Sequence, residues 1–198
     1  GACLMHCLFC DQIIQQPSSF TQFLFGIPSV YCCKKCEEQI EYTSDSHAIY
    51  FYNSFMQDVL HQFKFLKDIR VADFFAKALK NKVRGMEYDL IIPIPMHVEM
   101  EKKRTFSPVE VVLQQAKLPF QSVLEKTTMS QQSKKTYEQR INSSSFFKSL
   151  PQVDVSQQKI LLIDDLITTG TTIKHAKTIL LELGAKSVEE VIFISGKK

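Results

Sequence analysis

The sequence predicts an α/β protein in which a parallel sheet is joined to a small, cysteine-rich amino-terminal module. Two observations predict this fold class. Apolar segments of strand length alternate with amphipathic helical segments along most of the 198 residues, and this alternation is typical of a parallel sheet covered by helices. All six cysteines lie between residues 3 and 36. We therefore expect a small module over residues 1–45 and an α/β domain over residues 46–198.

The cysteines of the first module are spaced as metal ligands. Cys7 and Cys10 form one Cys-x-x-Cys pair, and Cys33 and Cys36 form a second. Two such pairs commonly supply four thiolates to one tetrahedral Zn²⁺ ion, and in a reducing compartment metal binding is favoured over disulfides. Four protein ligands leave no open coordination position, so the predicted zinc is structural.

Other assignments of the cysteine-rich segment stay open. Cys32 could replace Cys33 with a shift of one residue, and Cys3 and His6 lie close enough to act as spare ligands. A redox pair, or a cysteine-rich segment without a metal, is also compatible with the composition. If a metal binds, we expect the short apolar segment 20–30 to fold around it, because so few residues cannot stabilise themselves.

Helical periodicity marks residues 54–84. Apolar residues recur there at helical spacing, which predicts a face packed against a core. Arg84 and Gly85 form a plausible end, with a cation in the last turn and a glycine at the cap. The frequent phenylalanine indicates core packing rather than a ligand site. The apolar positions are Phe55, Val59, Leu60, Phe63, Leu66, Val71, Phe74, Phe75, Ala78 and Leu79.

Residues 89–95 predict the first strand of the core, because they are mostly apolar and end at a proline. Met96 and His97 follow this strand in the sequence. A helix is expected next, near residues 108–117, with Val109, Val112, Leu113 and Ala116 on its packed face.

Residues 127–149 are polar and rich in Ser, Gln and Lys. Such a segment is long for a plain connection and predicts a mobile functional loop. Its cations Lys134, Lys135 and Arg140, together with the basic cluster at 102–104, could neutralise a pyrophosphate or a nucleic-acid backbone. A solvated polar loop without a ligand is the alternative.

The most informative segment is 160–172. Residues 160–163 predict a buried strand, and Asp164 and Asp165 follow at its carboxyl end, where ligands bind in open α/β sheets. The next residues form a hydroxyl-rich turn that opens into a helix, whose amino terminus attracts anions. These turn residues are Thr168, Thr169, Gly170, Thr171 and Thr172.

The chemistry of this segment indicates a sugar phosphate. Two carboxylates would repel a bare phosphate, so the ligand should also carry hydroxyl groups or a hard cation such as Mg²⁺. Turn and cap formation alone would explain one such residue but not six. The sequence contains no Gly-x-x-x-x-Gly-Lys-Ser/Thr motif, which excludes a P-loop.

The end of the chain continues the α/β alternation. We expect a helix after the turn, with Ile173, Ala176, Leu180 and Leu183 on one face and Gly184 as its end. Residues 188–194 predict a further strand.

Residues 160–172 resemble the signature of type I phosphoribosyltransferases that binds 5-phosphoribosyl-1-pyrophosphate (PRPP). The resemblance implies that Asp164 and Asp165 bind the ribose hydroxyls and that residues 168–172 cradle the 5-phosphate. It also implies that the loop at Met96 and His97 receives the pyrophosphate, with Mg²⁺ bound alongside PRPP. Arg104 is expected to contact the same ligand.

The chain resembles the ComF competence family over nearly its full length. The likeness rests on the two cysteine pairs, on Phe63-Lys64, on Pro93-Ile94-Pro95 and on the acidic pair with its threonine turn. It extends to Gln132, Arg140, Asn142 and Phe146.

One departure from the ComF pattern lies after the predicted first strand. The family usually has Arg-Gly-Phe-Asn-Gln there, whereas this chain has Arg104-Thr105-Phe106-Ser107-Pro108. The arginine and the phenylalanine are retained, but the asparagine and the glutamine are not, which weakens the case for specific contacts at those positions.

The ComF resemblance implies a role in natural transformation, in which PRPP is bound and internalised single-stranded DNA is handled during or after its transport across the inner membrane. DNA-translocation proteins at that membrane are the implied partners. The candidate DNA surface joins Lys34 and Lys35 to the loop residues Lys134, Lys135, Tyr137 and Arg140.

Two alternatives to this role remain. One is an active phosphoribosyltransferase that transfers ribose 5-phosphate from PRPP to an unidentified amine or base; the sequence contains no recognisable acceptor site. The other is a zinc-bearing scaffold with a vestigial nucleotide site.

Composition sets broad limits. An apolar content of 44% and a charged content of 23% are ordinary for a soluble globular protein, and a net charge of +3 is too small to indicate nucleic-acid binding by itself. Residues 12–33 carry no charge, but their glutamines, serines and prolines exclude a bilayer span. The sequence contains no secretory signal, so we expect a cytoplasmic protein, in reach of the inner-membrane face.

Overall fold

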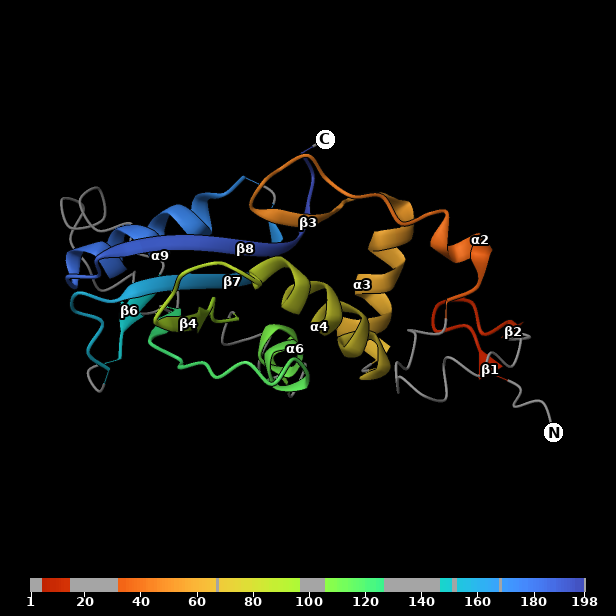
Figure 1. Ribbon diagram of the computed structural model, residues 1–198, viewed down its shortest axis with the longest axis horizontal. Helices are drawn as coiled ribbons and strands as arrows, with labels where there is room; N and C mark the ends of the chain where they lie inside the picture. Colours follow the sequence, from red (N-terminus) through yellow and green to blue (C-terminus); the bar gives the residue numbers. More distant parts are fainter. Residues whose placement is uncertain are drawn as a thin grey trace, which may run out of the picture.

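The computed structural model describes residues 5–14, 32–66, 68–96, 106–126, 147–150, 153–167 and 169–197 (Figure 1). The described elements before the first long helix are β1 (Met5–His6), β2 (Ile13–Ile14), α2 (Lys34–Glu37) and β3 (Ala48–Phe51). They are followed by α3 (Ser54–Leu66), α4 (Arg70–Val83), β4 (Leu90–Pro93), α6 (Pro108–Gln115), β5 (Leu124–Lys126), β6 (Phe147–Ser149), β7 (Lys159–Ile167), α9 (Thr171–Glu182) and β8 (Ser187–Ser195).

The centre of the molecule is a four-stranded sheet with the order β3-β8-β7-β4. Every neighbouring pair in it is parallel. The two nine-residue strands β7 and β8 lie in the middle and pair along nearly their whole length. Their continuous apolar runs are what a strand needs when both faces are covered. The predicted parallel α/β sheet is therefore confirmed.

Successive residues of β7 belong to opposite faces of the sheet. Leu161 and Ile163 join the core cluster formed with α3, α4 and α6, whereas Ile160 and Leu162 join the cluster formed with α9 and the small β5–β6 sheet. This alternation follows from the two-residue period of a strand. Figure 1 shows α9 on one side of the sheet and α4 and α6 on the other.

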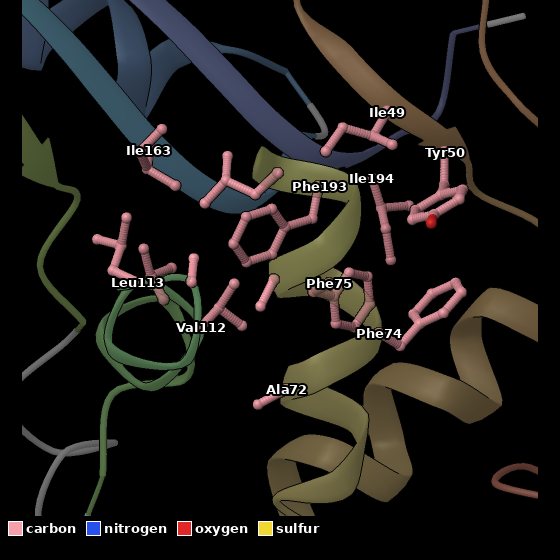
Figure 2. Close-up of a cluster of buried hydrophobic side chains, with 14 of the residues drawn as sticks. Ile49, Tyr50, Ala72, Phe74, Phe75, Val112, Leu113, Ile163, Phe193 and Ile194 are labelled. Carbon is pink, nitrogen blue, oxygen red and sulfur yellow. The ribbon is translucent and has the colours of Figure 1, made fainter. Parts of the chain in front are cut away.

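Aromatic side chains fill the core on the α4 face (Figure 2). Phe75 is fully buried and stacks on Phe193 of β8, with ring centroids 5.2 Å apart. Phe74 stacks on Tyr50 of β3 at 5.0 Å. Aromatic pairs of this kind add to the free energy gained by burying the rings themselves. Except for Phe65, which is 56% exposed, the phenylalanines of residues 54–84 pack in or against this core, as the sequence predicts.

The structure corrects the predicted start of the sheet. Residues 89–95 were expected to contain the first core strand, but β3 precedes β4 and lies at the other edge of the sheet. The four residues of β3 are too few to show a helical or strand periodicity in the sequence. Pairing with β8, which is nearly 150 residues away in the chain, makes them a strand.

Four further expectations are corrected at the ends of elements. Leu66 is 68% exposed and Leu183 is 40% exposed, because one is the last residue of α3 and the other lies beyond α9, where the packed face ends. The strand expected over 160–163 continues to Ile167, so the acidic pair lies within β7. Phe147 is buried and begins β6, which shortens the predicted polar loop.

The structure places the cysteine-rich segment at one end of the long axis of the molecule, beyond α3 (Figure 1). The boundary between residues 45 and 46 stays a prediction. In the part of the chain that the structure describes, no helix combines the length and the apolar character needed to cross a membrane.

Candidate functional site

The turn between β7 and α9 is shaped by Gly170. Its φ of 76° lies in the left-handed region, which glycine adopts without a steric penalty. Gly170 caps α9, and its carbonyl accepts a hydrogen bond of 3.0 Å from the N–H of Lys174. The first N–H groups of an α-helix have no partner within the helix. The turn therefore directs the amino terminus of α9, with its positive dipole end, toward the carboxyl end of β7.

Threonine hydroxyls gather at the same helix terminus. The hydroxyl oxygens of Thr169 and Thr171 lie 3.0 Å apart, and the N–H of Thr171 donates to the Thr169 hydroxyl. Both side chains are exposed, while Thr172 is half-buried. Thr168 lies outside the described residues. The described part of the turn thus offers hydroxyl and backbone donors together, which is the donor set that a phosphate group requires.

Asp164 lies in an environment that disfavours its charge. Burial raises the pKa of Asp164 to about 7, and the neighbouring charge of Asp165 adds to this shift. A hydrogen bond of 2.8 Å from the N–H of Asp165 to the Asp164 carboxylate opposes it, as do the positive charges of Lys126 and Lys64. A carboxyl group with such a pKa can both donate and accept hydrogen bonds near neutral pH, which suits a sugar hydroxyl.

Asp165 has a cationic partner on α3. The Nζ of Lys64 lies 2.6 Å from the Oδ2 of Asp165, and the two side chains are only 14% and 18% exposed. Sequence reasoning missed this contact, although Lys64 belongs to the Phe63-Lys64 pair that contributes to the ComF resemblance. The only signal in the sequence was a lysine directly after a core phenylalanine of a predicted helix.

The acidic pair lines one cleft of about 200 Å³ together with Met96, the described residue of the predicted pyrophosphate loop. They meet because β4 and β7 are adjacent and parallel, so their carboxyl ends lie at the same edge of the sheet. Met96 lines this cleft, whereas His97 and Arg104 lie outside the described residues. The lining residues are Lys64, Ile94, Pro95, Met96, Ser107, Pro108, Val109, Lys126, Asp164 and Asp165.

The second candidate site is the cysteine cluster. The sulfur atoms of Cys7, Cys10, Cys33 and Cys36 all lie within 4.8 Å of one another, and those of Cys10 and Cys33 are 3.6 Å apart. Zinc–sulfur bonds of about 2.3 Å in a tetrahedron place the sulfurs about 3.8 Å apart. The four thiols therefore fit a tetrahedral metal ion such as Zn²⁺.

Two of the alternative ligands, Cys32 and His6, do not belong to the cluster. The sulfur of Cys32 contacts the carbonyl oxygen of Cys33 at 3.5 Å, and among the described residues Cys33 rather than Cys32 belongs to the cluster. His6 lies 3.3 Å from the carboxylate of Asp11. Cys3 lies outside the described residues.

Backbone donors prepare one of the four sulfurs for metal binding. Burial alone would raise the pKa of Cys7, but hydrogen bonds from the backbone N–H groups of Cys33, Cys10 and Phe9 outweigh it and lower the pKa to about 6. The N–H of Cys33 is 3.3 Å from the Cys7 sulfur. A thiolate is the form that binds zinc.

The cysteine cluster is attached to the sheet domain through the residues between its first two cysteines. Phe9 makes edge-to-face contacts with Phe55 of α3 and Phe74 of α4, with ring centroids 5.3 and 5.2 Å apart. The side-chain amide of Gln62 on α3 donates a hydrogen bond of 3.0 Å to the carbonyl of Leu8. The first cysteine pair is therefore packed directly on the helix that carries Lys64.

Comparison with known proteins identifies the family. Residues 101–198 match the family model for the phosphoribosyl transferase domain. The competence protein ComFC of Bacillus subtilis strain 168 is 30% identical over 200 residues, which cover 95% of this chain and 83% of that protein. The chain belongs to the ComFC family of competence proteins. The competence protein ComFC of Streptococcus pneumoniae is 27% identical over 215 residues, covering 93% of this chain and 97% of the relative.

Solved structures show weaker likeness to this ComFC-family chain. The allosteric regulatory enzyme of purine biosynthesis superposes with a TM-score of 0.44 and 19% identity, over 61% of this chain and 25% of that one. A hypoxanthine phosphoribosyltransferase from Staphylococcus aureus has a TM-score of 0.40 and 14% identity, over 63% and 62% of the two chains.

Proposed function

We propose that this ComFC-family protein binds PRPP with Mg²⁺ in the cleft at the carboxyl ends of β4 and β7. We further propose that it acts in natural transformation by handling internalised single-stranded DNA. The observation that carries the PRPP proposal is that the acidic pair lines one cleft with Met96, while the threonine turn at the amino terminus of α9 directly follows the strand that carries the pair.

Each part of PRPP has a matching group in this arrangement. The carboxyl groups of Asp164 and Asp165 suit the vicinal hydroxyls of the ribose. The 5-phosphate suits the amino terminus of α9 with the Thr169 and Thr171 hydroxyls. The pyrophosphate is then assigned to the loop that begins at Met96, where Mg²⁺ would neutralise its charge.

The DNA proposal is supported by the family and by exposed cations. The relatives named above are competence proteins, and Lys34 and Lys35 are exposed on α2 beside the cysteine cluster. The other residues of the proposed DNA surface, Lys134, Lys135, Tyr137 and Arg140, lie outside the described residues. The protein would act in the cytoplasm, close to the DNA-translocation proteins of the inner membrane.

We also propose that the cysteine cluster holds a structural Zn²⁺ ion through Cys7, Cys10, Cys33 and Cys36. Two of these residues, Cys7 and Cys36, are almost fully buried. Binding of one ion would link the first cysteine pair to the start of α2 and so fix the end of the molecule on which Lys34 and Lys35 lie.

Calorimetric titration of two charge-matched variants tests the PRPP proposal. Asp164→Asn with Asp165→Asn should weaken PRPP binding at least about 100-fold, because the two carboxyl groups that would hydrogen-bond the ribose hydroxyls are removed. Asp58→Asn with Asp73→Asn removes two exposed carboxylates from α3 and α4 and should bind PRPP as the wild type does. Equal affinity in the two double variants would refute the site.

The DNA proposal is tested by the salt dependence of binding to a labelled single-stranded oligonucleotide. Affinity should fall steeply as salt increases, since binding releases counterions from the phosphates. Lys134→Ala with Lys135→Ala should weaken binding and flatten the salt dependence, whereas Lys80→Ala with Lys82→Ala on α4 should change neither. Binding that is insensitive to salt, or equal losses in both variants, would argue against this surface.

A further inference from the structure

We propose that the ammonium group of Lys64 occupies the position at Asp165 that a divalent cation would otherwise take. The acidic pair is then available to the hydroxyl groups of a ligand rather than to a metal ion. This inference names a positioning and specificity residue for the cleft, and it rests on the proposed PRPP function. In the sequence alone, two adjacent carboxylates are compatible with either ribose hydroxyls or a bound cation. The contact with Lys64 favours the binding of ribose hydroxyls over the binding of a cation.

The fold fixes the position of Lys64. The preceding residue, Phe63, is almost completely buried and packs against Phe75 and Phe106. Because the rotation of α3 is set by this packing, Lys64 is held at the side of the helix that faces the acidic pair. Its Nζ then reaches the Oδ2 of Asp165 at 2.6 Å.

The pair is shielded enough for the contact to persist. Both side chains are more than four-fifths buried, unlike the exposed ion pairs that contribute little and exchange readily with solvent. Breaking a shielded pair leaves an uncompensated charge, which is strongly unfavourable. In the ligand-free protein, Asp165 is therefore neutralised by the chain itself.

Among the described residues, the charges around the cleft need no metal to balance them. Lys64 and Lys126 line it together with Asp164 and Asp165, and burial raises the pKa of Asp164 to about 7, so the positive charge there at least equals the negative charge. A divalent ion that enters alone would have to displace the Lys64 ammonium from Asp165. It follows that Mg²⁺ should enter with the pyrophosphate, whose oxygens supply their own negative charge, and not ahead of it.

Removal of the lysine charge should uncover a cation site. Mn²⁺, a paramagnetic substitute for Mg²⁺, is titrated into the protein without PRPP and followed by the loss of its free electron paramagnetic resonance signal. We expect Lys64→Met to bind Mn²⁺ about tenfold more tightly than the wild type, because a carboxylate close to a second one loses the cation paired with it. Addition of Asp165→Asn to Lys64→Met should abolish the gain.

Two controls separate this role from a purely structural one. Lys64→Arg keeps the charge and should retain the weak Mn²⁺ binding of the wild type. Lys80→Met removes an exposed lysine from α4 and should also leave Mn²⁺ binding unchanged. If Lys64→Met does not fold, Lys64→Gln takes its place with the same expectation. An uncharged variant that folds and shows no gain in Mn²⁺ affinity would overturn the proposal.

A second titration, with PRPP and saturating Mg²⁺, tests the ligand side. Lys64→Met should bind PRPP about tenfold more weakly than the wild type, and Lys64→Arg should restore most of the affinity. Wild-type affinity in Lys64→Met would overturn the positioning role. If the wild type itself does not bind PRPP, the proposed function fails, while the Mn²⁺ titration still decides whether Lys64 occupies a cation position.

Discussion

Asp164 and Asp165 are neighbours in the chain but have different electrostatic surroundings. Asp165 forms a close ion pair with Lys64, whereas burial and the adjacent carboxylate raise the pKa of Asp164 to about 7. One group is thus balanced by a cation, and the other is partly protonated near neutral pH. The two carboxyl groups can therefore make different hydrogen bonds to a ligand with two hydroxyls.

The pKa of Asp164 predicts a specific pH dependence of stability. A carboxyl group with a pKa of about 7 in the folded protein holds its proton at pH values where the unfolded chain, with a pKa of about 3.9, has lost it. The folded state then binds more protons, so the free energy of unfolding falls as pH rises. This loss runs from about pH 4 to about pH 7 and then stops.

Urea unfolding at pH 5.5 and pH 8 measures this dependence. The wild type should lose stability relative to Asp164→Asn between these pH values, since asparagine does not titrate. Asp73→Asn, an exposed position on α4, serves as the control and should keep a constant difference from the wild type. A constant difference for Asp164→Asn as well would show that burial does not hold the proton on this group.

Gly170 provides a second test at single-residue level. Alanine at a φ of 76° is strained by about 1–2 kcal/mol, and its Cβ would lie 3.4 Å from the Cδ1 of Ile167. Gly170→Ala should therefore lower the free energy of unfolding and weaken PRPP binding. Gly85→Ala is the matched control, because Gly85 also has a positive φ but follows the end of α4 and does not line the cleft. It should show a similar loss of stability with unchanged PRPP affinity; a loss of PRPP affinity in both would contradict the role of the turn.

Among the elements, α3 connects the two candidate sites. Gln62 contacts Leu8 beside the first cysteine pair, Phe63 enters the core, and Lys64 reaches Asp165. Phe9 adds a contact with Phe55 near the start of the same helix. The stability of α3 should therefore depend on the cysteine cluster, although the cluster and the acidic pair do not share a residue.

Hydrogen exchange after removal of the metal tests this dependence. When zinc is removed with a chelator, the amides of α3 should exchange faster, because Leu8 and Phe9 are no longer held against the helix. The amides of α9, which packs on the opposite face of the sheet, serve as the internal control. Unchanged exchange in α3 would mean that the cysteine-rich segment and the sheet domain are energetically independent. PRPP binding should not be abolished in either case, since the acidic pair lies on β7 and the turn lies between β7 and α9.

Sequence patterns predicted the elements that are long and periodic. The sequence predicted the apolar faces of α4 and α9 and the continuous apolar run at 160–163, because each of these patterns extends over several residues. β3 was missed because its four residues acquire their identity only by pairing with β8. The end of β7 was misplaced because the acidic pair resembles a strand terminus, yet pairing with β8 continues to Ile167.

For the molecule as a whole, the sequence predicted the α/β architecture, the cysteine pairs and the acidic pair with its turn. It did not predict that Lys64 would meet Asp165, because about one hundred residues separate them and only the packing of α3 on the sheet brings them together. Similarly, it left Cys32 and Cys33 as alternatives, and the geometry of the four sulfurs favours Cys33. Contacts between segments that are far apart in the chain cannot be predicted from local sequence patterns.

The core on the α4 face should contribute a large part of the global stability. Phe75 is fully buried between Phe63 and Phe193, so Phe75→Ala should lower the free energy of unfolding by about 3–5 kcal/mol. Phe65→Ala removes a phenylalanine that is 56% exposed and should change it by less than about 0.5 kcal/mol. Denaturant unfolding of both variants measures the difference; similar values for the two would contradict the assignment of this core.

The measurement that tests the central claim most directly is a calorimetric titration of the metal-loaded wild type with PRPP, first with Mg²⁺ and then without it. We predict saturable binding with one PRPP per chain in the presence of Mg²⁺ and much weaker binding in its absence. No heat of binding in either buffer, from protein shown to be folded, would contradict the claim that the acidic pair and the threonine turn form a PRPP site.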